Sequence, residues 1–180
     1  DDVFGFNWSE DGEGVLYSSA VVDTQNNRNI NRVHRFDWQS EVNHTLYVYP
    51  DNAVFIGVSP APKGGCFLGV KVNYGDTLML YLNSEGKATR LSSSKGFFEY
   101  IGEKNGRCYF STDENAPMGH VLSIAAKDVE REGALVDGFA VALAEMDASL
   151  ESVGLTDEGI LAVHSRNACS EMALYSFEGK

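Results

Sequence analysis

Cysteine and basic residues are scarce in this sequence, and each shortage excludes a class of protein. The three cysteines, Cys66, Cys108 and Cys169, are odd in number, and their spacing fits no zinc motif. We therefore expect no disulfide framework and no metal or other cofactor. Cys66 and Cys108 both follow a turn glycine at the start of an apolar run, so we interpret them as small buried side chains at equivalent positions of two repeats.

Lysine and arginine total 14 against 26 aspartates and glutamates, which gives a formal net charge of −12. A chain this acidic repels the phosphates of nucleic acids and of anionic membranes, so we expect neither as a partner. No apolar run approaches the roughly 18 residues of a membrane span, and no signal peptide is recognisable. We expect a cytoplasmic rather than a secreted protein, and the glycosylation sequons Asn7–Ser9 and Asn43–Thr45 matter only in a secreted one.

The remaining composition is that of a turn-rich β protein. Hydrophobic residues make up 43% of the 180 positions and glycine accounts for 18 of them, so the chain can bury a sizeable core. Short runs rich in aromatic and β-branched residues alternate with turns that contain glycine, asparagine or aspartate. This alternation predicts antiparallel strands joined by tight turns.

The predicted strands recur in groups of four. A turn glycine follows the first strand of each group, at Gly12, Gly64, Gly106 and Gly159. Four-stranded repeats of roughly 40 to 50 residues are typical of β-propeller blades, which bury their apolar faces by stacking on one another. We therefore predict an all-β fold, a single β-propeller region over residues 1–180 with about four blades of four antiparallel strands. The blades are expected at approximately 1–50, 51–95, 96–138 and 139–180.

Some finer expectations follow from the local chemistry. Asparagine and aspartate over residues 23–31 predict a long polar loop tip, and the prolines and glycines of residues 59–65 predict a turn. Residues 134–136 form the expected fourth strand of the third blade, and the fourth blade lacks its last strand. Four aromatic side chains on the first two strands of successive blades are expected to be largely buried: Trp8, Tyr17, Phe67 and Tyr109.

No residue of the chain is predicted to carry chemistry. Gly57–Ala61 lacks the second glycine of a nucleophile elbow, and a strand rather than a helix follows it, so we interpret Ser59 as a turn residue. The four histidines are scattered over different strands and strand edges: His34, His44, His120 and His164. Acidic residues near a turn could pair as in propeller glycosidases, but a solvated surface is the simpler interpretation of Asp147, Glu151, Asp157 and Glu158.

Three stretches resemble the propeller of a known family. Thr112–Gly119, preceded by an aromatic pair, contains the Ala-Pro and turn residue of one characteristic phrase. Trp8–Tyr17 resembles a W-x-x-D-G-x-G-x-x-Y blade, and Asn31–Arg35 with Gln39–Glu41 resembles an outgoing strand. Together, and in their order along the first two thirds of the chain, these phrases resemble the propeller domain of the prolyl oligopeptidase family of serine peptidases. That propeller has seven blades, so the resemblance is to a part of it.

The resemblance implies a role without chemistry. In that family the propeller covers the active site of an α/β-hydrolase domain and limits substrates to short peptides, often cleaved after proline. The implied function is gating of short peptides, with the hydrolase domain of the parent protein as partner and with no catalytic residue in this chain. The alternative is a stand-alone propeller or β-sandwich module that binds a protein or peptide. A part of a ring would expose blade edges, which favours self-association into a homo-oligomer.

Overall fold

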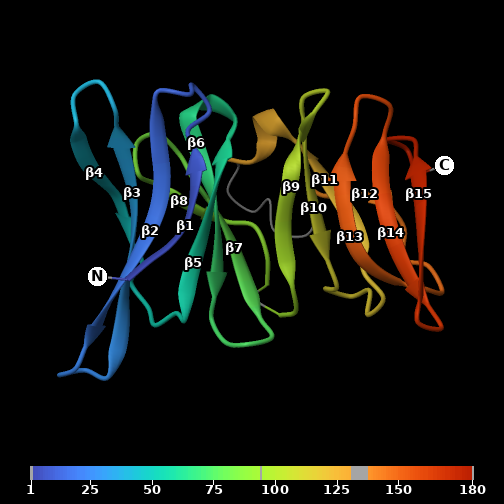
Figure 1. The fold of residues 1–180 in the computed structure, drawn as a ribbon, viewed down its shortest axis with the longest axis horizontal. Helices are drawn as coiled ribbons and strands as arrows, with labels where there is room; N and C mark the ends of the chain where they lie inside the picture. The colour runs from blue at the N-terminus through green and yellow to red at the C-terminus, as the bar shows by residue number, and fades with distance from the viewer. Residues whose placement is uncertain (1, 94, 131–137, 180) are drawn as a thin grey trace. The chain divides into compact units, whose positions relative to one another are not determined.

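A computed structural model describes residues 2–93, 95–130 and 138–179 of the chain. Its regular elements are β-strands and short 3₁₀ turns (Figure 1), and the strands form four separate antiparallel sheets. The chain divides into two compact units, Asp1–Lys95 (unit 1) and Gly96–Lys180 (unit 2). None of the helices in the described ranges is long and apolar enough to cross a membrane.

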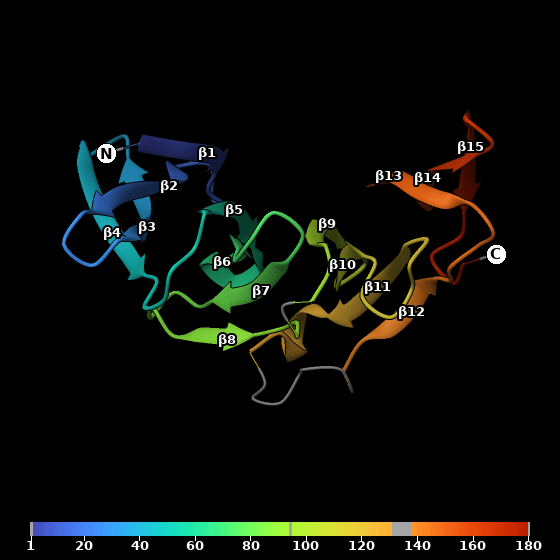
Figure 2. The ribbon, with the colours of Figure 1, turned by 90° about the horizontal axis from the view of Figure 1, so that it is seen from below.

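Unit 1 contains two four-stranded sheets whose strands follow one another in chain order. The first sheet consists of β1 (Asp2–Trp8), β2 (Gly14–Asp23), β3 (Arg28–Asp37) and β4 (Val42–Val48). The second sheet consists of β5 (Phe55–Ala61), β6 (Gly65–Lys71), β7 (Thr77–Leu82) and β8 (Ala88–Arg90), with the short 3₁₀ turn η1 (Pro62–Gly64) between β5 and β6. In Figure 2, β5 lies beside β1 and β2.

The two sheets of unit 1 share one apolar core. Leu16 and Val33 of the first sheet pack with Ile56, Leu68 and other fully buried side chains of the second. The ring of Phe4 stacks on that of Phe55 at 6.1 Å. These contacts bury one face of each sheet, as expected for blades that cannot bury themselves alone.

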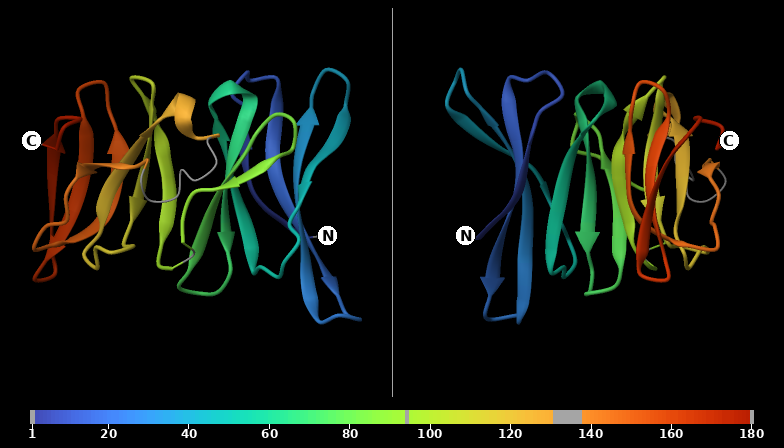
Figure 3. Two further views of the ribbon diagram at one scale, coloured as in Figure 1. Left: turned by 180° about the vertical axis from the view of Figure 1, so that it is seen from behind. Right: turned by 45° about the vertical axis from the view of Figure 1, so that its right-hand side comes forward.

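Unit 2 contains a third sheet of four strands and a fourth sheet of three. The third sheet consists of β9 (Phe98–Lys104), β10 (Arg107–Thr112), β11 (His120–Ala125) and β12 (Ala140–Leu143), and the turn η2 (Ala126–Asp128) follows β11. The fourth sheet consists of β13 (Ser149–Leu155), β14 (Ile160–Arg166) and β15 (Cys169–Tyr175). Successive strands of both sheets pair antiparallel, and Figure 3 shows the ribbon from two further sides.

The Thr112–Gly119 segment, the connection between β10 and β11, is fixed by hydrogen bonds to three other parts of unit 2. The Thr112 hydroxyl donates to the Phe97 carbonyl at 2.6 Å. The Met118 N–H donates to the Glu145 carboxylate at 2.6 Å, and the Met118 carbonyl accepts the Leu150 N–H at 2.7 Å. The segment that carries the strongest sequence resemblance therefore joins β10 to the chain before β9 and to β13.

Several expectations about strand ends were wrong. The expected loop at residues 23–31 is a hairpin, because the Asp23 carboxylate accepts the N–H groups of Gln25 and Asn26 and allows the ladder to reach Asp23 and Arg28. Ser59 lies in β5 opposite Phe67 and not in a turn. Pro60 also lies in that strand, which is possible because β5 is an edge strand of its sheet and needs no N–H there.

The end of the third blade also differs from the expectation. Residues 134–136, where its fourth strand was expected, lie outside the described residues. The fourth strand of this sheet is β12, which pairs with β11 and begins after residue 138, the expected blade boundary. The fourth sheet has three strands within the described residues, in line with the prediction of a fourth blade without its last strand.

The burial predictions were partly right. Phe67 and Tyr109 are each 1% exposed, and Tyr17 is half-buried against the ring of His34. Trp8 is 60% exposed, so its prediction was wrong. The neighbouring Asn7 side chain reaches the Val58 carbonyl of the second sheet at 2.7 Å, so alternation along β1 turns Trp8 to the opposite face, where it packs on Trp38.

Candidate binding cleft

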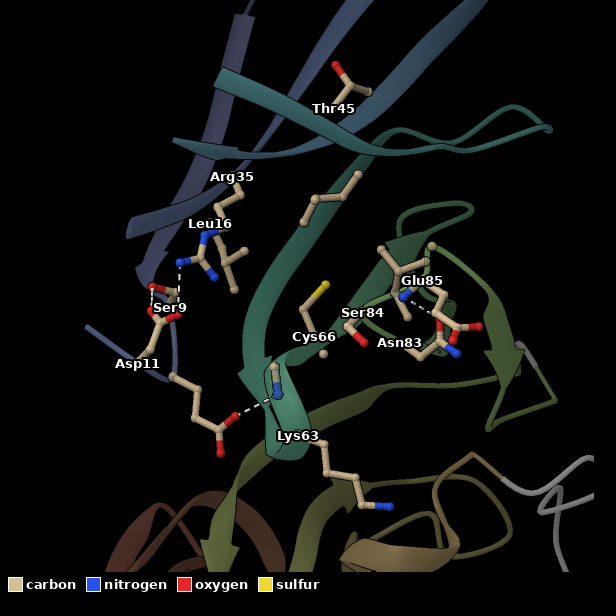
Figure 4. Close-up of a pocket in the computed structure, with 16 residues that line it drawn as sticks. Ser9, Asp11, Leu16, Arg35, Thr45, Lys63, Cys66, Asn83, Ser84 and Glu85 are labelled. Carbon is tan, nitrogen blue, oxygen red and sulfur yellow. Dashed lines mark hydrogen bonds and ion pairs between the residues drawn. The ribbon is translucent and has the colours of Figure 1, made fainter. Parts of the chain in front are cut away.

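A cavity of unit 1 lies where the turns of its two sheets meet. It has a volume of about 660 Å³, within the range of small-ligand sites. The β1–β2, β5–β6 and β7–β8 turns supply its walls, and strand β4 contributes Thr45 and Leu46 (Figure 4). We refer to this cavity as the cleft.

The floor of the cleft is apolar. Leu16, Cys66 and Leu82 are 4%, 2% and 1% exposed and belong to the core shared by the two sheets, and the partly buried Leu46 packs against them. Burial raises the pKa of the Cys66 thiol to about 12. The thiol therefore stays protonated and acts as a small apolar group rather than as a nucleophile.

One wall consists of an ion pair held by the β1–β2 turn. The Asp11 carboxylate accepts hydrogen bonds from the Ser9 hydroxyl at 2.5 Å and from the Glu13 N–H at 3.0 Å, and it pairs with the Arg35 guanidinium at 2.8 Å. These partners, with Ser9 the strongest, lower the pKa of Asp11 to about 2. Asp11 is therefore charged and fully engaged at neutral pH, and it offsets the charge of Arg35.

The turn between β5 and β6 forms a second wall and is tied to the first sheet. The Glu10 carboxylate accepts the Gly64 N–H at 2.8 Å. Lys63 adopts a left-handed backbone conformation with φ of 65°. In Figure 4 the Lys63 side chain extends away from Leu16 and Cys66, so its ammonium group does not cover the floor.

The turn between β7 and β8 forms the third wall. The Asn83 side-chain oxygen accepts the N–H groups of Glu85 and Lys87 at 3.1 and 2.8 Å, which fixes the turn. This arrangement presents Ser84 and Glu85, both exposed, at the cleft. Within residues 2–93, 95–130 and 138–179, the Glu85 carboxylate has no ion-pair or hydrogen-bond partner.

The structure does not bring the predicted acidic residues into a catalytic pair. Asp157 pairs with Lys104 of β9 at 2.5 Å, which lowers its pKa, and Glu151 accepts the Ser170 hydroxyl at 2.8 Å. Asp147 uses its backbone carbonyl to accept a hydrogen bond from the Arg166 guanidinium. Glu158 is exposed, and its backbone N–H donates to the Thr156 hydroxyl at 3.2 Å. None of the four acidic residues lines the cleft.

The histidines lie apart. His34 is 8% exposed, and its ring nitrogens lie 2.8 Å from the Ser19 hydroxyl and 3.2 Å from the Thr45 hydroxyl. Burial lowers its pKa. The Ser19 side chain is itself only 3% exposed, so this serine–histidine pair has no access to a substrate. We interpret it as a cross-strand polar contact in the first sheet.

The other three histidines have separate surroundings. His44 is exposed on β4, and His164 is buried with its ring edge-on to Tyr175. Burial lowers the pKa of His120, although Glu145 and other nearby carboxylates oppose the shift. No group of three His, Cys, Asp or Glu side chains in the described part of the chain could hold a metal ion.

The prediction that Cys66 and Cys108 are buried is confirmed. They are 2% and 0% exposed near the starts of β6 and β10, the second strands of their sheets, whereas Cys169 is exposed. Burial raises the pKa of Cys108 to about 12, as it does for Cys66. The cleft itself was not predicted, and the recurrence of turns at matching places in successive repeats was the signal that could have located its walls.

A smaller cavity in unit 2 lies beside the Thr112–Gly119 segment. It has a volume of about 280 Å³, and residues 149–153 form its other side. The cleft of unit 1 is more than twice as large and has an apolar floor of buried side chains. The cleft is therefore the better candidate for a ligand site.

No protein-family model and no curated protein matches the sequence significantly. Solved structures of other proteins do align with the fold of this chain. Prolyl oligopeptidase B from Galerina marginata, bound to a 35mer hydrolysis and macrocyclization substrate, aligns with a TM-score of 0.75 and 19% identity over 97% of this chain and 26% of its own. Its apo form aligns with a TM-score of 0.72 and 19% identity over 98% of this chain and 26% of its own.

A prolyl endopeptidase studied for inter-domain dynamics in catalysis and specificity aligns with a TM-score of 0.73 and 17% identity over 97% of this chain and 27% of its own. The chain thus spans about a quarter of the length of the structures it matches. At these identities the likeness shows the fold. The predicted all-β, propeller-type fold is confirmed, and so is its resemblance to part of the propeller of prolyl oligopeptidases.

Proposed function

We propose that this chain is the non-catalytic β-propeller portion of a prolyl oligopeptidase-like serine peptidase. The observation that supports the proposal is the fold likeness to prolyl oligopeptidases over 97% of the chain and 26% of the solved protein. Because the likeness covers nearly all of this chain but only about a quarter of the solved protein, we infer that the chain is one part of a larger protein of this kind.

The proposed role is to gate access of short, proline-containing peptides to a hydrolase domain outside this chain. The chemistry of the chain supports a role without catalysis, because Ser59 lies within strand β5 and the Ser19–His34 pair is buried. The proposed partners are the hydrolase domain and short peptides.

Self-association through an exposed sheet face is also part of the proposal. On the outer side of the first sheet, Trp8 and Trp38 pack on each other at 5.1 Å but remain 60% and 43% exposed. Clustered large apolar side chains of this kind are typical of contact surfaces. Light scattering of the purified chain at low micromolar concentration should show a homo-oligomer, and a strict monomer would contradict this part of the proposal.

Deletion of residues 1–180 from the longer parent protein tests the gating role. The parent should cleave a short chromogenic prolyl peptide and leave a long unfolded polypeptide intact. A variant without residues 1–180 should lose this discrimination, either by cleaving both or by cleaving neither. Labelling with a serine-directed phosphonate shows whether its hydrolase domain is still folded. A folded deletion variant that keeps the preference for short peptides would contradict gating.

The chain alone should not hydrolyse the chromogenic prolyl peptide above the buffer rate, and the phosphonate should leave Ser59 unlabelled. Turnover that disappears in Ser59→Ala would overturn the proposal that this chain is non-catalytic. A Ser111→Ala variant is a matched control, because Ser111 also lies within a strand, β10.

A stand-alone module that binds a protein or peptide is the second candidate function, and the cleft is the observation that favours it. This function requires no hydrolase domain. The purified chain should then recover a single partner in stoichiometric amount, and the recovered partner should contain no serine hydrolase domain.

A further inference from the structure

We infer that the cleft of unit 1 binds an organic cation carried on a short apolar stem, such as an alkylammonium or the side chain of a lysine or arginine in a peptide. Such binding goes beyond the proposed gating role, because it needs neither a hydrolase domain nor proline in the ligand.

The shape and floor of the cleft select the apolar stem. A volume of about 660 Å³ would hold several such side chains, so a stem can reach the floor without displacing a wall. The floor consists of Leu16, Cys66 and Leu82, with Leu46 beside them. Each methylene group that leaves water for this floor contributes roughly 0.8 kcal/mol.

The charges on the walls select a cation. Arg35 is already paired with Asp11 at 2.8 Å, so its positive charge is largely offset. Among the residues that the structure describes, the Glu85 carboxylate has no partner, and the Glu10 carboxylate accepts a single hydrogen bond, from the Gly64 N–H to Oε2. Two carboxylates can therefore accept bonds from an ammonium or guanidinium group without losing an existing contact.

The same walls disfavour an anion. The cleft is lined by two cationic side chains, Arg35 and Lys63, and Lys63 extends away from the floor (Figure 4). To reach Arg35, an anion would have to displace Asp11, whose carboxylate also holds the Ser9 hydroxyl and the Glu13 N–H. The net charge of −12 adds a long-range attraction for cations and a repulsion for anions. The cleft therefore discriminates by the sign of the ligand charge as well as by the length of the stem.

Titrations followed by ¹H–¹⁵N correlation spectra test the inference on the whole chain. Three probes share an apolar stem: n-pentylammonium, the capped amino acid Nα-acetyl-lysine methylamide, and hexanoate. The two cations should shift the amides of Gly64, Gly65, Glu85 and Gly86, and hexanoate should bind at least about tenfold more weakly, a difference of about 1.4 kcal/mol. If the capped lysine binds more tightly than pentylammonium, the backbone contributes to binding and the ligand is a side chain within a peptide. If the two bind equally, an alkylammonium without a peptide backbone is sufficient for binding.

Variants in which the two glutamates lose their charge provide a second test of cation binding. The double variant Glu10→Gln/Glu85→Gln should weaken pentylammonium binding about tenfold or more, whereas the control Glu158→Gln, an exposed glutamate of unit 2, should leave it unchanged. A dispersed amide spectrum shows that the double variant is folded. Equal affinity for hexanoate and pentylammonium, no shift of the cleft amides by either cation, or unchanged binding by the double variant would each overturn the inference.

Discussion

The Thr112 hydroxyl lies 2.6 Å from the Phe97 carbonyl, and this hydrogen bond ties the end of β10 to the chain that enters β9. The same oxygen accepts the Glu114 N–H at 3.0 Å, so one side chain fixes both the sheet and the turn that follows. Thr112 is 1% exposed, and water cannot readily replace these bonds.

The Thr112→Val variant should therefore be less stable. Valine keeps the shape but loses both hydrogen bonds, which should lower the free energy of unfolding by about 1–3 kcal/mol. Urea denaturation measures the difference. Thr24→Val, at an exposed position of the β2–β3 turn, is the matched control and should change stability little. Equal losses in the two variants would contradict the assigned role of Thr112.

Gly119 ends the same segment in a conformation that other residues rarely adopt. Its φ is +86°, and an added Cβ would lie 2.9 Å from the Cβ of Leu150. Gly119→Ala should lower the free energy of unfolding by more than about 1 kcal/mol, because both the backbone and the packing oppose a side chain. Gly154→Ala is the control, since Gly154 has no atom within 4 Å of its added Cβ and no positive φ. A thermal melt in which Gly154→Ala is the less stable variant would contradict this prediction.

The interior of most strands could be predicted from the sequence, because period-two patterns and turn residues act locally. The predicted strands at Thr77–Leu82 and His120–Ala125 coincide with β7 and β11. Strand ends differ from the prediction where a side chain or a neighbouring strand alters a local rule. The Asp23 carboxylate extends a hairpin that the asparagines suggested was a loop, and the edge position of β5 accommodates Pro60.

The cleft did not follow from local sequence patterns, because its β1–β2 and β5–β6 walls come from turns more than 50 residues apart and only a comparison of the repeats could have brought them together. The Glu10–Gly64 hydrogen bond joins residues separated by 54 positions, and nothing in either turn alone indicates the other. The side of the sheet that Trp8 occupies was unpredictable for a related reason. It depends on which face of β1 meets the second sheet, as the Asn7–Val58 contact shows.

Asp11 should make stability depend on pH in the acidic range. Its pKa falls from an ordinary 3.8 to about 2 in the folded chain, so the unfolded state binds the proton first as the pH falls. The stabilisation is present above about pH 4 and is lost as the pH falls through 2. Because the pair with Arg35 is partly exposed, solvent screening limits the effect to about 1 kcal/mol or less.

Thermal melts of wild type and Asp11→Asn over this pH range measure that contribution. The variant should melt at a lower temperature at pH 6, and the two melting temperatures should converge as the pH approaches 2. Asp51→Asn, at an exposed position, serves as the control and should track the wild type throughout. A constant difference between Asp11→Asn and wild type at every pH would contradict the assigned pKa shift.

The three thiols should differ sharply in reactivity. Cys66 and Cys108 are buried with pKa values of about 12, whereas Cys169 is exposed on β15. A thiol reacts as its thiolate, so both protonation and burial protect the first two. Ellman's reagent should titrate one thiol in the native chain at pH 8 and all three in guanidinium chloride. Cys169→Ser should leave no fast-reacting thiol, and rapid native labelling of that variant would show that Cys66 or Cys108 is accessible and that the core of its sheet opens readily.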